Sequence, residues 1–296
     1  MITRMETNSV WVPKDLPCAK ALGLPSFELA EWQECNCQRR VLLLNLMPEK
    51  AKTEADIVRT LVATGETCQL IPIKIKGQVY KTTPKKHMDS FYLDFENIEC
   101  GYFERLIITG APLEQMPFEE VRYWHQLQNI MHWADEHVRS TLYICWGAQA
   151  GLYEHYGVKK YPLPEKMFGV FSQKVLNADN PLMHELTPAF LMPNSRHTEV
   201  RLVDVLPMAE KGLVTLAVSE ESGVGIMATA DCKRVFVVGH LEYNAHTLDD
   251  EYRRDLSKKL PIKRPLHYYD EDGEICYSWQ NDAVTFYRNW VASLSM

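Results

Sequence analysis

One cysteine in this chain occupies a position that suits a nucleophile. In TLYICWGAQAGLYEHYG (residues 141–157) a β-prone apolar run ends at Cys145, and Gly147 and Ala148 then predict a tight turn into a helix. Backbone N–H groups at such a corner lower the pKa of a thiol and can bind an oxyanion. Most isolated cysteines instead fill a small space in the core. Cys145 is therefore either a core side chain or a nucleophile, and the other seven cysteines have no comparable sequence context.

A thiol nucleophile needs a base, and the base needs a group that orients it. Two His-x-Glu patterns could supply both, at His197–Glu199 and at His240–Glu242. On an extended segment this spacing puts the two side chains on the same face. We favour His240 and Glu242 because they directly follow a strongly apolar strand. A solvated or capping histidine is the alternative interpretation of either pattern.

Several basic residues could bind an anionic group of a substrate. An arginine fork is the usual ligand for the carboxylate of an amino acid, whereas single charges are more often solvated. The sequence alone does not choose among Lys50, Lys166, Arg196, Arg253 and Arg254. It contains no Gly-rich phosphate loop of the Walker or dinucleotide kind, which argues against kinases and nicotinamide-dependent enzymes.

The elements predicted from apolar periodicity alternate between strand and helix. The predicted strands cover 40–46, 68–76, 105–110 and 142–144, and the predicted helices cover 51–65, 117–138 and the residues after Cys145. This order favours an α/β fold with an open, mostly parallel sheet and helices on both faces. Reactive groups gather at the carboxyl ends of the strands in such a sheet. Gly110–Pro112, Cys145 and Gly239–Glu242 all lie at such ends.

The second half of the chain is less regular. The prolines of residues 158–211 predict strands joined by long loops, which often shape a pocket. Three strands are predicted at 212–219, 223–230 and 233–240, and two helices near 247–259 and 281–293. We predict that residues 1–39 form an arm packed on the main body and that residues 40–296 form a single domain.

Composition excludes some classes of protein. The 296 residues carry a formal net charge of -7, which argues against a dedicated nucleic-acid surface. No apolar stretch has the length of a signal peptide or approaches the roughly 20 residues of a membrane span, so we expect a cytoplasmic protein. The scattered cysteines indicate reduced thiols. Cys35-Asn36-Cys37 lacks the spacing of a structural zinc site, and we expect no metal.

Longer motifs resemble one known family. NLMPEK (45–50), ITGAPLE (108–114), ICWGAQAGLYEHYGV (144–158), KYPLPEKMFGVF (160–171), PNSRHTEV (193–200) and GHLEY (239–243) together resemble the MetA-type homoserine O-acyltransferases. This homoserine transsuccinylase family is part of the class I glutamine amidotransferase-like superfamily. The match runs in order from about residue 10 to the end. It implies a flavodoxin-like α/β fold and a ping-pong acyl transfer from an acyl-coenzyme A to the side-chain hydroxyl of homoserine.

The resemblance also implies roles for individual residues. Cys145 is similar to the family's acylated nucleophile, His240 to its general base and Glu242 to its third catalytic residue. The positions that match substrate-contacting residues are Lys166, Ser195, Arg254, which binds the amino-acid carboxylate, and Lys50 of the active-site loop. Glu114 falls where glutamate goes with acetyl donors and glycine with succinyl donors. A carboxylate there would repel the free carboxylate of a succinyl group.

The implied substrates are small molecules, with acetyl-CoA as co-substrate and no tightly bound cofactor. We expect the backbone N–H of Trp146 to help bind the oxyanion, and we expect a homodimer. Leu241 and Asn244 replace a proline and an aspartate of most family members, which leaves homoserine and serine open as acceptors. A glutamine amidotransferase or cysteine hydrolase and a non-catalytic protein on the same fold are further alternatives.

Overall fold

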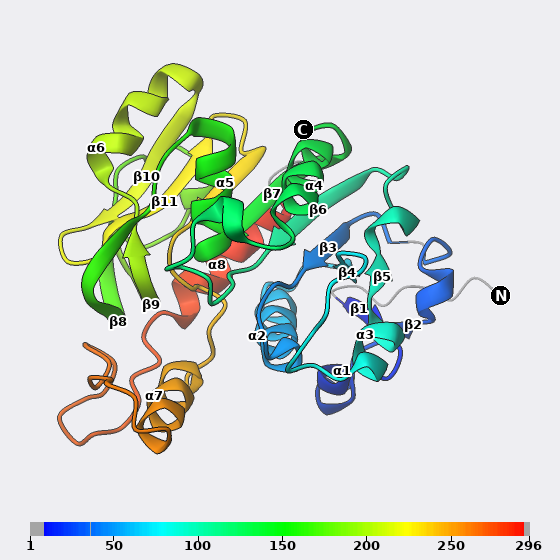
Figure 1. Cartoon of the computed structure of the whole chain (residues 1–296), viewed down its shortest axis with the longest axis horizontal. Coiled ribbons are helices and arrows are strands. Elements are labelled where there is room, and N and C mark those ends of the chain that lie inside the picture. The colour runs from blue at the N-terminus through cyan, green and yellow to red at the C-terminus, as the bar shows by residue number, and fades with distance from the viewer. Residues whose placement is uncertain (1–8, 36, 293–296) are drawn as a thin grey trace.

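A large open sheet runs through the molecule (Figure 1). The computed structural model describes residues 9–35 and 37–292, so the first eight residues of the predicted arm, Asn36 and residues 293–296 lie outside it. Within these ranges the chain forms a twelve-stranded sheet with the order β2-β1-β4-β3-β6-β7-β12-β11-β10-β8-β9, and β5 pairs with β4.

One half of the sheet is parallel. Its strands are β1 (Val10–Pro13), β2 (Ser26–Phe27), β3 (Arg40–Leu44), β4 (Cys68–Lys74), β5 (Leu93–Asp94), β6 (Phe103–Ile108), β7 (Val138–Ile144) and β12 (Arg234–Val237). The central strands are buried on both faces, which explains their continuous apolar sequences. Residues 10–13 of the predicted arm extend this half as β1, and the boundary at residue 39 stays a prediction.

The other half of the sheet is antiparallel. It consists of β8 (Tyr161–Val175), β9 (Ala189–Glu199), β10 (Leu213–Ser219) and β11 (Gly223–Thr229). The sequence predicted strands joined by long loops between 158 and 211, and the structure has two long paired strands there, β8 and β9. Pro162 is compatible with a strand because it lies beside an irregularity in the pairing of β8 with β9. Short turns α6 (Leu202–Val205) and η5 (Leu206–Lys211) follow β9.

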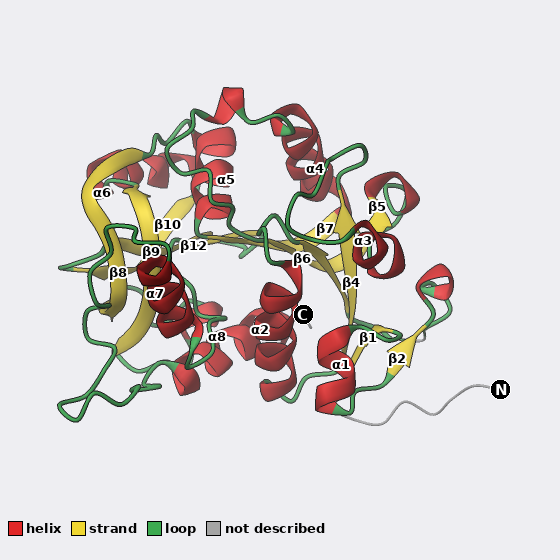
Figure 2. Cartoon of the chain, turned by 60° about the horizontal axis from the view of Figure 1, so that its bottom comes forward, coloured by secondary structure: helices red, strands yellow, loops and turns green. Residues whose placement is uncertain are grey.

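Helices cover both faces of the sheet. Figure 2 shows α4 (Trp124–His137) and α5 (Trp146–Tyr156) on one side, and α1 (Pro17–Leu22), α2 (Lys50–Ala63) and α8 (Gln280–Ala292) on the other. Each face has its own apolar core: one includes Ile57 and Phe286, and the other includes Leu127 and Leu152. The helix α3 (Lys85–Phe91) lies near α1 and β5, and α7 (Thr247–Ser257) lies below β8 and β9 in the view of Figure 1.

The helix predicted at 117–138 is wrong at both ends. A short 3-10 turn, η3 (Phe118–Glu120), precedes it, and Val121 then has an extended backbone, so the helix begins at Trp124. Val138 already belongs to β7. The apolar residues Phe118 and Val121 fit the spacing of a helical stripe. In the structure they pack in the core from a 3-10 turn and from the extended residue that follows it.

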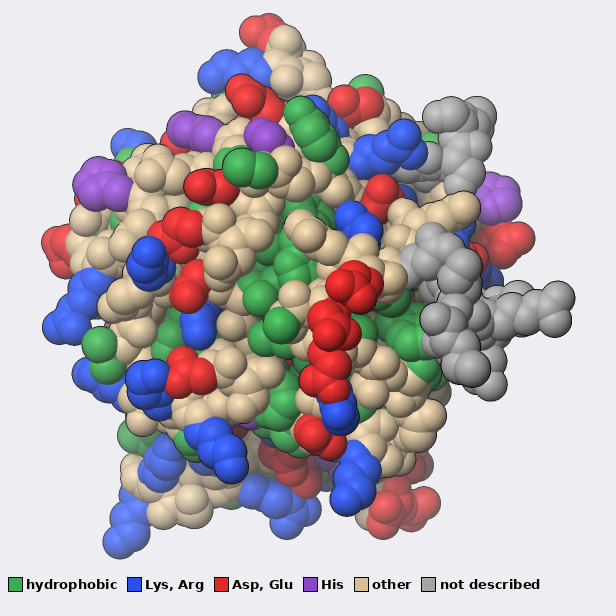
Figure 3. Space-filling model, turned by 90° about the vertical axis from the view of Figure 1, so that its right-hand side faces the viewer, with side chains coloured by type: hydrophobic (Ala, Val, Ile, Leu, Met, Phe, Trp, Pro, Cys, Tyr) green, Lys and Arg blue, Asp and Glu red, His purple; other side chains and the backbone are tan. Residues whose placement is uncertain are grey.

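On the face drawn in Figure 3, acidic and basic side chains are mixed over most of the surface, and a row of acidic side chains runs near the centre beside apolar ones. Among the described residues no helix combines the length and the apolar character needed to cross a membrane.

Candidate active site

Cys145 stands on a strained corner between β7 and α5. Its backbone has φ 54° and ψ -116°, a conformation that costs energy for a residue with a side chain. The Cys145 N–H donates to the Val237 carbonyl at 2.8 Å, and its carbonyl accepts from the Gln149 N–H at 3.1 Å. These bonds hold the corner in place. The backbone geometry is that of a nucleophile elbow, which places a side chain at the amino terminus of a helix. The Cys145 side chain is nevertheless buried, with 4% of its surface exposed, and it borders an apolar core.

Gly147 permits this corner. A Cβ atom at position 147 would lie 2.7 Å from the carbonyl oxygens of both Ile108 and Thr109. Helix α5 can therefore approach the end of β6 only if residue 147 is glycine. Gly110 after β6 lies against Cys145 in the same way, since a Cβ atom there would be 3.3 Å from the Cys145 Cβ and 3.6 Å from the Trp146 nitrogen.

His240 and Glu242 lie beyond the end of β12. The His240 Nδ1 and the Glu242 Oε1 are 2.7 Å apart, and both side chains are buried. The His240 ring stacks on Tyr243 with a centroid distance of 4.0 Å, and its backbone N–H donates to the Pro193 carbonyl at 2.8 Å. The imidazole is thus held by a carboxylate at one nitrogen and by an aromatic ring on one face.

Cys145 lies near enough to His240 to influence the charge of the imidazole. Burial disfavours a charged imidazole, but the charge of Cys145, the charge of Glu242 and hydrogen bonds to both residues raise the pKa of His240 well above its ordinary value. The arrangement therefore favours an imidazolium beside the thiol. A cysteine paired with a histidine cation is the usual form of an activated thiol nucleophile.

The second His-x-Glu pattern lies elsewhere. His197 is exposed on β9, whereas Thr198 between His197 and Glu199 is buried. The Thr198 hydroxyl donates to the Gln149 Oε1 at 2.8 Å, and the Gln149 Nε2 donates to the Thr198 carbonyl at 3.2 Å. This segment therefore anchors α5 to β9, while the carboxylate-held histidine beside Cys145 is His240.

Four predicted substrate contacts have different surroundings. Glu251 of α7 brings three of them together: it accepts from Lys166 Nζ at 2.7 Å and from Ser195 Oγ at 2.9 Å, and it lies 3.5 Å from Arg254 Nη2. Sequence reasoning missed Glu251, although its i,i+3 spacing from Arg254 on a helix is a signal that could have found it. The result is a cluster with both cationic and anionic groups.

The remaining basic candidates point to other partners. Arg196 is buried and donates to the Asn194 side chain at 3.2 Å and to the Thr198 carbonyl at 2.7 Å. Arg253 is exposed and pairs with Asp249 at 2.6 Å. Arg254 also pairs with Asp255 at 2.7 Å, so a substrate carboxylate would share its guanidinium. Among the candidates left open by the sequence, Lys166 and Arg254 are those next to Glu251.

Lys50 is the first residue of α2, and its side chain is buried. The Lys50 Nζ donates to the carbonyls of Asn45 at 2.5 Å and Met47 at 2.9 Å. Burial lowers the pKa of Lys50 to about 8, with the charge of Glu54 opposing the shift. The ammonium group therefore stabilises the turn between β3 and α2 through its bonds to two main-chain carbonyls of that turn. Its lowered pKa means that it loses its proton within a pH range that can be tested.

Glu114 lies half-buried in the loop that follows β6. Lys160 was missed by sequence reasoning and ties this loop down, because its Nζ donates to the main-chain oxygens of Glu114 and Met116 at 2.6 Å each. Burial lowers the pKa of Lys160 to about 8. The backbone N–H of Trp146 is in the first turn of α5, where N–H groups have no partner within a helix.

The two residues that depart from the family pattern, Leu241 and Asn244, are close in sequence to His240 and Glu242. Asn244 Nδ2 donates to Asp56 Oδ1 at 2.6 Å, and Asp56 also accepts from Thr247 Oγ1 at 3.2 Å and pairs with Arg59 at 3.0 Å. Leu241 is buried in an apolar core. Burial raises the pKa of Asp56, and the charge of Glu242 adds to this effect, so Asp56 and Glu242 are electrostatic neighbours.

The corner cysteine, the carboxylate-held histidine and the cluster around Glu251 lie on an open α/β sheet whose fold is glutamine amidotransferase-like. Within the described residues, no group of three metal-binding side chains comes together. A glutamine amidotransferase from Thermotoga maritima has a similar structure, with a TM-score of 0.53 at 16% identity over 86% of this chain and 97% of that chain. A second, from Methylobacillus flagellatus, has a TM-score of 0.53 at 14% identity over 87% and 95%. These likenesses confirm the predicted fold.

The chain belongs to the homoserine O-succinyltransferase family, whose model matches residues 9–295. The homoserine O-acetyltransferase of Lachnoclostridium phytofermentans is 44% identical over 287 residues, which are 95% of each protein. That of Bacteroides thetaiotaomicron is 47% identical over 255 residues, 85% of this chain and 83% of that protein. The predicted family is confirmed, and the chain is an acyltransferase.

Proposed function

We propose that the chain transfers an acetyl group from acetyl-CoA to the side-chain hydroxyl of L-homoserine, through an acyl-cysteine on Cys145. The observation that carries this proposal is the position of Cys145 on a strained elbow, with the hydrogen-bonded His240–Glu242 pair nearby. The names of the relatives support homoserine as acceptor and acetyl as the transferred group. The product would serve methionine biosynthesis.

In the first half-reaction, the Cys145 thiolate attacks the carbonyl carbon of the acetyl thioester. The carbonyl oxygen becomes an oxyanion, which we assign to the Trp146 N–H and to a second N–H from the Gly110 or Lys50 turn. The carbon–sulfur bond of acetyl-CoA then breaks, and the coenzyme A sulfur takes the proton from the His240 imidazolium. The enzyme now carries an acetyl thioester on Cys145 and a neutral imidazole.

In the second half-reaction, homoserine binds at the Glu251 cluster. The Arg254 guanidinium binds the substrate carboxylate, and the Glu251 carboxylate can accept from the substrate ammonium. His240 takes the proton of the substrate hydroxyl, whose oxygen attacks the acetyl carbon and displaces the Cys145 thiolate. Glu242 fixes the imidazole and stabilises its cationic form.

The choice of donor is assigned to Glu114. Its carboxylate would narrow the acyl pocket and repel the free carboxylate of a succinyl group. Lys160 supports this assignment because it holds the Glu114 main chain in place. No tightly bound cofactor takes part in the scheme.

Serine is the alternative acceptor, since it lacks only one methylene. A methylene gives about 1 to 3 kcal/mol of discrimination, so both amino acids could bind at the Glu251 cluster. The cytoplasmic location and the homodimer also stay predictions.

The test is a pair of measurements on the purified protein. Intact mass spectrometry after mixing with acetyl-CoA alone should show one added acetyl group, which Cys145→Ala should lack. Rates of acetyl transfer to homoserine and to serine are then compared side by side. An acetyl adduct that persists in Cys145→Ala, or release of ammonia from glutamine without any acetyl transfer, would exclude the proposed reaction.

A further inference from the structure

A groove of about 650 Å³ lies beside Lys166 on the antiparallel half of the molecule. Its walls come from the beginning of β8, from His197 on β9 and from the segment 261–266 that follows α7. Gln115, which is adjacent to Glu114, lines it as well. The groove therefore borders both the loop assigned to acyl choice and a residue of the Glu251 cluster.

An irregularity in β8 opens this groove. Pro162 pairs with Thr198 and Met167 pairs with Arg196, so four residues of β8 (163–166) stand opposite His197 alone. The extra residues of such a bulge leave the plane of the sheet. They form one wall, and Lys166 at the end of the bulge turns towards Glu251.

The opposite wall depends on Gly169. The Leu266 N–H donates to the Phe168 carbonyl at 3.0 Å, and the Val170 N–H donates to the Leu266 carbonyl at 2.9 Å. Gly169 between them has φ 152°, and a Cβ atom there would lie 2.4 Å from the Leu266 oxygen. Only glycine allows this segment to lie directly on β8, where Figure 1 shows it next to α7.

The groove combines positive charge with apolar surface. The segment 258–264, KKLPIKR, carries four basic residues on a chain whose net charge is -7. Of these, Lys263 and Arg264 line the groove, beside apolar Leu163, Ile262 and Leu266. Lys263 makes an exposed ion pair with Glu165 at 2.6 Å, which contributes little and can be exchanged for a ligand. Arg264 lies over the Tyr269 ring at 4.2 Å.

We propose that this groove binds the phosphorylated nucleotide end of the acyl-coenzyme A donor, with its phosphates on Lys263 and Arg264. The proposal rests on the proposed function, which requires a donor that carries a diphosphate and a phosphorylated ribose. Cationic side chains bind such groups, and the apolar wall can cover the adenine or the pantetheine arm. Lys166 and Gln115 connect the groove to the acceptor cluster and to the acyl pocket.

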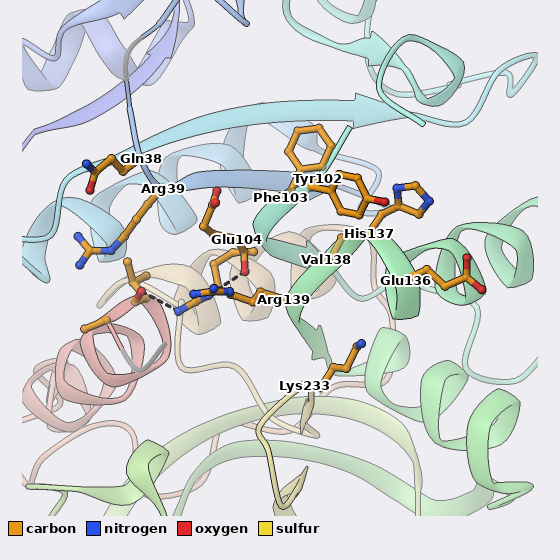
Figure 4. A pocket seen from close by; sticks show the side chains of 13 residues that line it. Gln38, Arg39, Tyr102, Phe103, Glu104, Glu136, His137, Val138, Arg139 and Lys233 are labelled. Atoms are coloured by element: carbon orange, nitrogen blue, oxygen red, sulfur yellow. Dashed lines mark hydrogen bonds between the residues drawn. The ribbon is translucent and has the colours of Figure 1, made fainter. Parts of the chain in front are cut away.

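Figure 4 shows a second hollow with basic lining residues, of about 600 Å³. Its position does not suit the donor. Its cationic residues stand near the amino ends of the parallel strands: Arg39, Arg105, Arg139 and Lys233. Arg139 is near the amino end of β7, whereas Cys145 follows the carboxyl end of this strand. A strand rises about 3.3 Å per residue, so the two residues lie roughly 20 Å apart. Arg105 donates to the main-chain oxygens of Trp290 at 2.7 Å and Val291 at 2.8 Å, which ties α8 to the sheet.

The test compares two donors in two double variants. Acetyl-pantetheine carries the same thioester as acetyl-CoA but no nucleotide. In Lys263→Gln/Arg264→Gln, the KM for acetyl-CoA should rise about tenfold, as expected for the loss of charge-assisted contacts. The KM for acetyl-pantetheine and for homoserine should stay within about twofold of the wild type. The control Arg139→Gln/Lys233→Gln removes the same charge from the opposite hollow and should leave the KM for acetyl-CoA unchanged.

Three results would overturn the groove: an unchanged KM for acetyl-CoA, an equal rise for both donors, or an equal rise in the control variant. If the wild type uses neither donor, the proposed function fails by itself. Calorimetric titration with coenzyme A then tests the groove directly. A dissociation constant about tenfold weaker in Lys263→Gln/Arg264→Gln than in the control would support the groove, and equal constants would reject it.

Discussion

Replacing Asn244 by the aspartate of most family members should destabilise this chain. Asn244 Nδ2 donates to the buried carboxylate of Asp56 at 2.6 Å. In Asn244→Asp the donor becomes a second carboxylate at the same separation. Two carboxylates this close cannot both remain charged, so one of them must take up a proton.

The magnitude follows from the charges involved. At an effective dielectric constant of about 20, two unit charges about 4 Å apart repel by about 4 kcal/mol. A carboxyl group that keeps its proton near pH 7 must have a pKa about three units above the ordinary value of an aspartate. A shift of this size also corresponds to about 4 kcal/mol. Arg59, 3.0 Å from Asp56, offsets part of the repulsion. We expect the free energy of unfolding to fall by about 2 to 4 kcal/mol at pH 7.

The pH dependence distinguishes this mechanism from a simple packing defect. The pKa of the carboxylate pair would be higher in the folded state than in the unfolded state, so the folded state binds more protons between the two values. The stability of Asn244→Asp relative to the wild type should therefore recover as the pH falls from 7 towards 5.

Urea unfolding of Asn244→Asp and the wild type at pH 7, 6 and 5 measures both effects. The exposed substitution Asn97→Asp makes the same change of charge away from a buried carboxylate and serves as control. If Asn244→Asp were as stable as the wild type at pH 7, or if its deficit did not change with pH, the assigned contact between Asn244 and a charged Asp56 would be wrong.

Three further substitutions test the site. Glu114→Gly should shift the ratio of kcat/KM towards succinyl-CoA over acetyl-CoA, and an unchanged ratio would remove Glu114 as the acyl selector. Arg254→Ala should raise the KM for homoserine about tenfold or more, because the substrate carboxylate loses its ligand. The acetyl-enzyme should still form at the wild-type rate, because Glu251 and Asp255, which also lose a partner, have no role in the first half-reaction. Equal damage to acetyl-enzyme formation in stopped-flow measurements would contradict this. The Lys50 ammonium holds the turn between β3 and α2, which is one of the two turns assigned to the oxyanion, and its pKa is lowered to about 8. Acetyl-enzyme formation should therefore decline as the pH rises above that value and the ammonium loses its charge. Lys50→Gln should abolish this decline.

The central sheet could be predicted from the sequence because its strands are buried on both faces. Continuous apolar runs such as 40–46 and 105–110 have no other simple explanation in a chain of this length. The β8–β9 pair could not be predicted in the same way. Its prolines read as loop signals, and only the pairing shows that Pro162 borders a bulge and that Pro193 pairs with Val170 inside a ladder.

The candidate site divides along a similar line. Cys145 and His240 could be found because they directly follow apolar strands, and strand ends meet at one edge of a parallel sheet. Lys160 and Asp56 could not, because no local pattern distinguishes a buried or paired charge on a helix or loop from a solvated one. For Glu251 the one local signal was its i,i+3 spacing from Arg254. Their roles depend on contacts between segments far apart in the chain, such as Lys160 with the loop after β6.

We also expect the family departures at Leu241 and Asn244 to have little influence on the choice of acceptor. Asn244 contacts Asp56, and Leu241 packs in a core, whereas the groups assigned to the amino-acid acceptor surround Glu251. Discrimination between homoserine and serine should therefore depend on the distance from the Glu251 cluster to Cys145, which one methylene must span. Asn244→Asp, assayed at pH 6 where part of its stability returns, should keep the wild-type ratio of kcat/KM for the two acceptors. A shifted ratio would mean that Asn244 acts on the acceptor through Glu242 and His240.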